Sequence, residues 1–284
     1  MSKPVISSAA DAELFQSHGS RIEAFFNLDD FVKRLINPMI QASAVDAKTQ
    51  TAVVFDDGSF DNTDVFGLLY GSKALGFMTL LATNKERQVN EVLATYPVAD
   101  GETHRARIDE VMVWDNQICA TIRCTIGDYS LAFFATDFYR NKEKYSESEM
   151  LDINLAAFAC AAEEADKGFS FEGQQAVDWL AKMGEKPTYD EDGSVQPVRF
   201  STEDLVAYLD LESKAPDEAQ FQSPAGPVES MSFVDIELYK TSIKIRGNDA
   251  DFSVPLFLRN EFIPNLEEKM PIRGYSCMIG RIEE

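Results

Sequence analysis

Hydrophobic and polar residues alternate most clearly between residues 103 and 138. Ile118 and Ile122 fall on one side of the pattern, whereas Thr121 and Arg123 fall on the other. Side chains of a β-strand alternate between two faces in this way. Short connectors rich in Asp, Asn and Gly interrupt the alternation twice, so the segment predicts a three-stranded antiparallel meander.

Other parts of the chain have different periods. Residues 11–46 carry apolar side chains at helical spacing, which predicts an N-terminal helical segment. Residues 51–83 are predicted to form strands interrupted by glycines. Residues 172–184 and 201–212 are predicted helices, and the second begins with a serine, a threonine and carboxylates suited to a helix N-terminus. Residues 227–284 return to a strand pattern.

The segment 147–166 gives two conflicting signals. Ser146 and Glu149 have the spacing of a capping box, and the alanines that follow favour a helix. Leu151 and Ile153 instead alternate with polar residues, as in a strand. We interpret the segment as a strand that becomes helical towards its end.

One sequence pattern occurs twice. IRCTIGDYSL at 122–131 and IRGNDADFSV at 245–254 share Ile-Arg, an aspartate, an aromatic residue, a serine and a branched aliphatic residue at the same spacing. The offset is 123 positions, and FAC at 158–160 and YSC at 275–277 follow at a slightly different offset. Both pairs keep their strand alternation, so we interpret them as an internal duplication.

The pattern therefore predicts a mainly β protein with α additions, of the α+β class. We divide it into an N-terminal helical segment (1–50), a first β module (51–166), an acidic helical connector (167–222) and a second β module (223–284) that partly repeats the first. Small antiparallel modules of four or five strands resemble barrels of the OB type at the level of fold.

The net charge limits the classes of partner. The 284 residues include 48 acidic and 26 basic side chains, for a formal net charge of −22. Residues 161–220 alone carry fifteen acidic and five basic side chains. Nucleic-acid binding depends on Lys and Arg that neutralise phosphates. The charge therefore disfavours nucleic acid and anionic membranes without excluding a local basic groove.

The N-terminal residues and the cysteines indicate the cellular compartment of the protein. The first twenty residues lack the apolar segment of a signal peptide, and no window is apolar enough for a membrane span. The four cysteines, Cys119, Cys124, Cys160 and Cys277, include no CxxC spacing, and we expect free, mostly buried thiols. These features predict a soluble, cytoplasmic protein.

No catalytic, metal or cofactor motif emerges from the sequence. Its two histidines, His18 and His104, lack metal-ligand spacing, and the usual nucleophile, P-loop and dinucleotide-binding patterns do not occur. Aspartates cluster at 56–64 and 190–192, but turn chemistry accounts for them better than calcium. We therefore predict no catalytic residue, no metal site and no cofactor.

The repeat supplies the candidate binding residues, which are Arg123, Tyr129, Arg246 and Phe252. An Arg–Asp pair across each hairpin would fix the strand register. In the alternative interpretation, each arginine lies beside the aromatic residue on one binding face, as in barrels that bind single-stranded nucleic acid or in protein–protein hot spots.

We expect a non-catalytic binding protein whose partner is another protein. The first alternative is single-stranded nucleic-acid binding through an OB-like barrel. The second is an enzyme whose site is assembled from carboxylates such as Asp56, Asp61 and Asp109. No pattern in the chain predicts an oligomeric state.

Overall fold

The computed structural model describes residues 3–8, 19–210, 215–247 and 250–283. Strands account for 56% and helices for 14%, which confirms the predicted mainly β fold with α additions. None of the described helices is long and apolar enough to cross a membrane.

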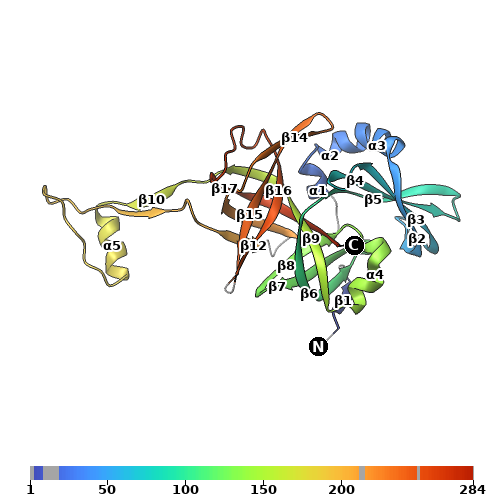
Figure 1. Ribbon diagram of the computed structural model, residues 1–284, viewed down its shortest axis with the longest axis horizontal. Coiled ribbons are helices and arrows are strands. Elements are labelled where there is room, and N and C mark those ends of the chain that lie inside the picture. Colours follow the sequence, from blue (N-terminus) through green and yellow to red (C-terminus); the bar gives the residue numbers. More distant parts are fainter. Residues whose placement is uncertain (1–2, 9–18, 211–214, 248–249, 284) are drawn as a thin grey trace.

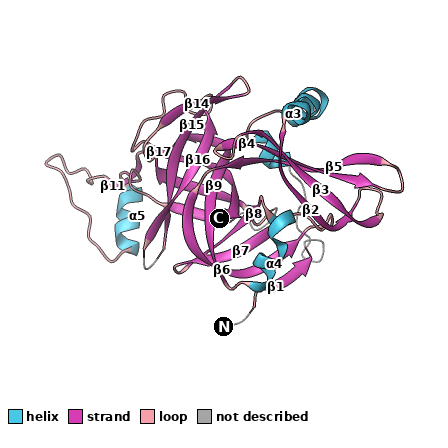
Figure 2. Cartoon of the chain, turned by 45° about the vertical axis from the view of Figure 1, so that its right-hand side comes forward, coloured by secondary structure: helices cyan, strands magenta, loops and turns pink. Residues whose placement is uncertain are grey.

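Five strands close into a barrel (Figures 1 and 2). They are β6 (Glu102–Val113), β7 (Ala120–Ile126), β8 (Tyr129–Ala135), β9 (Met150–Glu164) and β17 (Pro271–Ile282). The first three form the predicted antiparallel meander. β17 pairs parallel with β8 and antiparallel with β9, and β9 closes the ring by pairing with β6. Helix α4 (Phe138–Glu147) joins β8 to β9.

The barrel strands β9 and β17 also pair with a second layer of strands. This layer comprises β12 (Ala207–Asp210), β13 (Glu218–Pro224), β14 (Glu229–Phe233), β15 (Ile236–Arg246) and β16 (Asp251–Arg259). β13 pairs antiparallel with β17, and β16 pairs parallel with β9. Buried Ile122 of β7 and Ile245 of β15 belong to one continuous hydrophobic core, so the two halves share their interior.

A second sheet packs against the outside of the barrel. It contains β2 (Ala44–Val54), β3 (Phe60–Gly71), β4 (Leu75–Asn84) and β5 (Val89–Ala99), all antiparallel. The N-terminal segment supplies α1 (Gly19–Glu23), α2 (Leu28–Asp30), a π-helical turn η1 (Phe31–Leu35) and α3 (Ile36–Ala42). A separate strand, β1 (Val5–Ser8), pairs parallel with β6. Phe25, Phe77 and Phe158 meet in the core between these layers.

Two segments with a predicted helical part are strands there instead. In 147–166 the predicted strand is present, but β9 stays extended to Glu164 because Ala159, Ala161 and Ala162 pair with β17. β12 occupies part of the predicted helix 201–212, because it pairs with β13 and buries Tyr208. Tertiary pairing outweighs local helix propensity in both places. The expected capping box also opens no helix, since Ser146 lies in the last turn of α4 and bonds to the Lys142 carbonyl.

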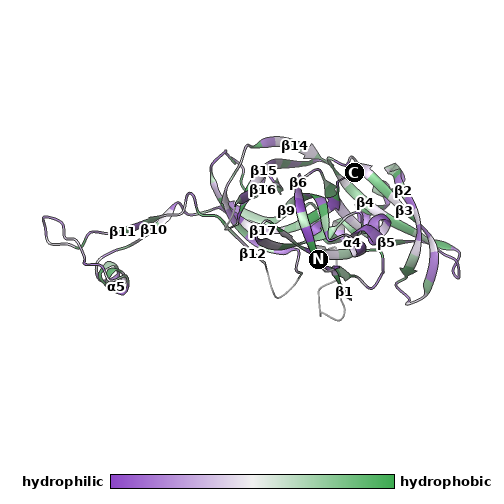
Figure 3. Cartoon of the chain, turned by 60° about the horizontal axis from the view of Figure 1, so that its bottom comes forward, coloured by the Kyte–Doolittle hydropathy of each residue, from purple (hydrophilic) through white to green (hydrophobic). Residues whose placement is uncertain are grey.

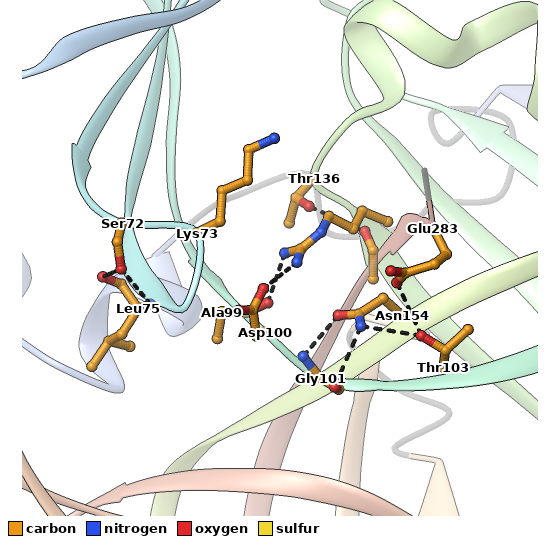
Figure 4. A network of polar contacts seen from close by, with 12 residues as sticks. Ser72, Lys73, Leu75, Ala99, Asp100, Gly101, Thr103, Thr136, Asn154 and Glu283 are labelled. Carbon is orange, nitrogen blue, oxygen red and sulfur yellow. Dashed lines mark hydrogen bonds and ion pairs between the residues drawn. The ribbon is translucent and has the colours of Figure 1, made fainter.

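The link from the second sheet to the barrel is held by polar contacts (Figure 4). Arg281 donates to the Ala99 carbonyl at 2.9 Å and forms an ion pair with Asp100. Asn154 exchanges hydrogen bonds with both backbone groups of Gly101, at 2.7 and 3.3 Å. A Cβ at Gly101 would collide with the backbone of Leu155. The link therefore requires glycine at this point.

The N-terminal helices are attached to the barrel by a buried ion pair. Arg21 and Asp217 are 0% and 1% exposed, and the Arg21 guanidinium also lies 4.7 Å from the Phe134 ring centroid. Burial acts to lower the pKa of Arg21, but the charge and hydrogen bond of Asp217, together with Cys277 and Glu218, raise that pKa above its usual range. The outer face of β8 at Phe134 is thereby covered by the chain itself.

Candidate functional site

The two predicted aromatic residues lie together where the repeated hairpins meet. The centroids of the Tyr129 and Phe252 rings are 6.3 Å apart, and both rings pack against the barrel core. The Tyr129 hydroxyl donates to the Tyr208 carbonyl, and the His104 ring contacts Phe252 at 5.1 Å. This aromatic cluster joins the two halves of the molecule.

The two predicted arginines lie on the other face of their strands. In the strand register Tyr129 stands opposite Ile126, and Phe252 stands opposite Ile245, so both rings share the core-facing side. Arg123 and Arg246 alternate with these apolar positions and are half exposed. The geometry does not bring arginine and aromatic residue onto one binding face.

The two arginines differ in their ion pairs. Arg246 stands opposite Asp251 across the hairpin, with the charged atoms 3.7 Å apart, as the register hypothesis expects. Arg123 instead pairs with Glu110 of the neighbouring strand β6, at 3.6 Å. Asp128 lies in the turn, outside the strand register, and therefore does not stand opposite Arg123.

Of the carboxylates named as an enzymatic alternative, Asp56 and Asp61 both belong to the β2–β3 hairpin, whereas Asp109 lies on β6 of the barrel. Asp61 binds Lys85 at 3.0 Å in the β2–β5 sheet. Asp109 lies on the barrel, where Arg107 and Thr125 donate to it at 2.7 and 2.6 Å. Asp56 is exposed in a turn. Among the described residues, no three His, Cys, Asp or Glu side chains are grouped to hold a metal ion.

The most unusual feature is an arm that extends away from the barrel (Figures 1 and 3). We define the arm as residues 168–201, which contain β10 (Gly168–Phe171), helix α5 (Gln174–Lys182) and β11 (Val198–Ser201). β10 and β11 pair antiparallel as a two-stranded ribbon. Helix α5 confirms the first of the two helices predicted in this region. The sequence gives no comparable signal for the ribbon, because its strands have four residues each and lie far apart.

Four aromatic rings form the small core of the arm. Phe169 stacks on Phe200 with centroids 4.9 Å apart, and Phe171 stacks on Trp179 at the same separation. A Cβ at Gly168 would collide with the Phe200 carbonyl, so glycine lets the two strands approach. The helix is thus fixed to the ribbon by ring stacking.

The arm is surrounded by solvent. Apart from the Glu203 amide, which donates to Ser201 Oγ at 3.4 Å at the base of the arm, no hydrogen bond, ion pair or ring contact joins its residues to the rest of the chain described by the structure. Attachment is confined to its base, where Thr202 donates to the carbonyls of Asp166 and Lys167. Large apolar side chains remain exposed on it: Phe169 by 53%, Met183 by 63% and Tyr189 by 58%.

The tip of the arm is acidic and its turn is self-contained. Asp192 accepts hydrogen bonds from both the backbone and the hydroxyl of Ser194, and these bonds lower the pKa of the Asp192 carboxyl. The arm as a whole carries six acidic and three basic side chains. The acidic cluster at 190–192 is therefore organised as a turn whose charges face solvent.

A groove of about 290 Å³ begins near the base of the arm. Exposed Leu209 and Tyr275 line it beside Arg273, which forms ion pairs with Glu163 at 2.8 Å and Asp166 at 3.7 Å. A second exposed apolar surface therefore lies next to the base of the arm.

The chain matches no protein-family model, no curated protein and no solved structure. Its own residues are therefore the basis on which a function can be argued.

Proposed function

We propose that this chain is a non-catalytic binding protein whose arm engages another protein. The observation that carries the proposal is the arm itself: a solvent-surrounded ribbon and helix whose aromatic core stays half exposed. An isolated two-stranded ribbon is marginally stable in water. Burial against a partner would remove the exposed apolar surface and add stability to the ribbon.

The residue types on the arm fit a protein interface. Tryptophan and tyrosine are enriched among the residues that dominate binding energy in such interfaces, and contiguous exposed apolar surface marks interaction sites. Trp179 and Tyr189 both lie on the arm, with Met183 exposed at the end of α5. We infer that the partner offers an apolar cleft for this helix and its flanking side chains.

The charge of the arm further limits the partner. Six acidic side chains against three basic ones favour a partner surface that is basic around the apolar cleft. Such an interaction weakens as salt screens exposed charges. The rate of association should therefore fall as ionic strength rises, which would not be expected of an interface held by apolar contacts alone.

The decisive experiment removes the arm without disturbing its base. Gly168 and Ser201 are directly paired, so a short Gly-Ser link can replace residues 169–200. Affinity-tagged wild-type and arm-deleted chains would be used to capture partners from source lysate, and binding of a purified partner would then be measured by calorimetry. We expect stoichiometric binding for the wild type and loss of binding for the deletion.

Point variants supply the matched comparison. Met183→Ser and Tyr189→Ser change exposed arm residues, whereas Phe60→Ser changes an equally exposed residue on β3, which belongs to the other sheet. The first two should weaken binding at least tenfold, and the third should leave it unchanged. Full binding by the arm-deleted chain would overturn the proposal.

A second candidate function concerns the outer face of the β15–β16 hairpin. Lys240, Lys244 and Arg246 occupy alternate positions of β15, beside an open groove of about 480 Å³. A row of basic residues along a groove is a feature that favours binding of single-stranded nucleic acid. Glu102 and Glu229 also line the groove and oppose that role. Oligonucleotide anisotropy at low salt tests it, and an unchanged signal would reject it.

Two further points belong to the same proposal. We infer that the hairpins β7–β8 and β15–β16 derive from one duplicated unit, supported by their constant offset of 123 positions and by their matching parallel pairings, of β8 with β17 and of β16 with β9. We also infer a cytoplasmic location, supported by four cysteines that form no disulfide.

A further inference from the structure

Cys160 and Cys277 are brought together by the pairing of β9 with β17. The two residues are far apart in the sequence, yet their Sγ atoms lie 3.3 Å from each other. A bulge near Tyr275 and Ser276 shifts the register at this point and lets the two side chains meet across the strand pair. A disulfide has about 2.05 Å between its sulfurs, so the two sulfur atoms must approach each other from their present contact for the bond to form.

The two thiols differ in access. Cys277 is fully buried, whereas Cys160 is half-buried and retains contact with solvent. The other two cysteines, Cys119 and Cys124, are each no more than 1% exposed. Cys160 is therefore the thiol that a small oxidant can reach first, and Cys277 is the neighbouring thiol that can attack Cys160 once it is modified.

We propose that Cys160 and Cys277 form a redox-modification site, in which a low-molecular-weight disulfide converts the two thiols into a reversible disulfide between β9 and β17. No other pair of thiols in the described residues has the contact that this reaction needs. The site is independent of the arm and of its proposed partner.

The reaction balances in two thiol–disulfide exchanges. The Cys160 thiol loses its proton to solvent, and the thiolate attacks one sulfur of oxidised glutathione; a mixed disulfide forms and one glutathione thiolate leaves. The Cys277 thiol then loses its proton and attacks Cys160 Sγ, which releases the second glutathione. The protein gives up two electrons and two protons, and one oxidised glutathione becomes two reduced glutathione molecules.

The surroundings of Cys277 make the second exchange the slow one. Its hydrogen bond with Cys160 and its burial raise the pKa of the Cys277 thiol well above the usual range. Arg21 of α1 and Asp217, which precedes β13, also act on this thiol, with opposite signs. The mixed disulfide on Cys160 should therefore be observable before the internal disulfide replaces it.

The experiment follows the number and identity of the free thiols. The full chain is incubated with oxidised glutathione at pH 8, quenched with iodoacetamide, and analysed by mass spectrometry and peptide mapping. We expect a transient adduct of one glutathione on Cys160, followed by a product lighter than the reduced chain by two hydrogens, with residues 160 and 277 linked. Addition of dithiothreitol should restore all four free thiols.

Matched variants separate the site from general oxidation. Cys277→Ala should stop the reaction at the glutathione adduct on Cys160, and Cys160→Ala should remove both products, whereas Cys119→Ala should form the internal disulfide as the wild type does. The wild-type peptide map decides the question even where a variant fails to fold. An unmodified wild-type chain, or a disulfide involving Cys119 or Cys124, would overturn the proposal.

Discussion

The rings of Tyr129 and Phe252 meet edge to face, with centroids 6.3 Å apart and planes at 65°. Each follows the turn of one repeated hairpin, and the turns themselves adjoin, since a Cβ at Gly247 would stand 2.5 Å from Asp128 Oδ1. The repeated aromatic position is thus a joint between the two halves. Both rings are partly buried against the core, which gives the repeated aromatic position a structural role.

Removing the hydroxyl of Tyr129 tests this joint. Tyr129→Phe leaves the Tyr208 carbonyl without its side-chain donor, so we expect the free energy of unfolding to fall by about 1 kcal/mol. Urea denaturation measures the change. Tyr275→Phe is the control, because the exposed Tyr275 hydroxyl accepts a hydrogen bond from the exposed Gln220 side chain. An equal effect of the two changes would contradict the assigned role.

The meander could be predicted because its pattern is local. Ile122 and Arg123 alternate between core and solvent, and short turns connect consecutive strands. Repeated Ile-Arg and aromatic positions likewise mark the two hairpins. Alternation does not reveal which strand lies next to which. The sequence pattern predicts that Arg123 pairs with Asp128 in the turn before β8, but the ion pair of Arg123 is with Glu110 of β6, the neighbour on the other edge of β7.

The arm could not be predicted because its strands pair over a long separation. Gly168 pairs with Ser201, and the intervening residues look like loop and one helix when read alone. β9 was difficult for a related reason, since its alanines have high helix propensity and only the neighbouring strands make it extended. The shape of the arm depends on this pairing of distant strands. Composition therefore predicts that the segment is acidic, but it does not predict the ribbon.

The buried ion pair of Arg21 and Asp217 should be the most sensitive point of the N-terminal attachment. Asp217→Asn leaves the Arg21 charge buried without a counter-charge, and we expect a loss of about 3–5 kcal/mol in the free energy of unfolding. Denaturant titration provides the measurement. Asp29→Asn is the control, because its ion pair with Lys33 is exposed and worth at most about 0.5 kcal/mol. Similar losses in both variants would refute this assignment.

Asp137 should make stability depend on pH in the direction opposite to most carboxylates. Burial raises the pKa of its carboxyl above the usual 3.8, although hydrogen bonds from Tyr145, Asn141 and the Ile282 amide act to lower it. The folded state therefore binds this proton more tightly than the unfolded state. The resulting stabilisation is present below the ordinary pKa and is lost as pH rises through the raised one.

The measurement compares wild type and Asp137→Asn by thermal unfolding across the acidic pH range. The stability of the wild type relative to the variant should decrease as pH rises from about 4. Asp57→Asn is the control with the opposite sign, because hydrogen bonds from Ser59 lower the pKa of the exposed Asp57 carboxyl. A wild-type advantage over Asp137→Asn that increases with pH would show that the Asp137 proton is not retained in the fold.

The arm should unfold independently of the barrel. Its ring contacts involve only its own residues, so Trp179→Ala should separate α5 from the ribbon and leave the main core intact. We expect hydrogen exchange at residues 168–201 to accelerate at least tenfold, while β9 and β17 keep their protection. Trp114→Phe provides the contrast, because Trp114 is buried in the core beneath the second sheet and its loss should lower the global transition. Loss of protection in β17 after Trp179→Ala would mean that the arm is an integral part of the barrel fold. Deletion of the arm would then disturb the barrel as well, and loss of binding could no longer be attributed to the arm surface.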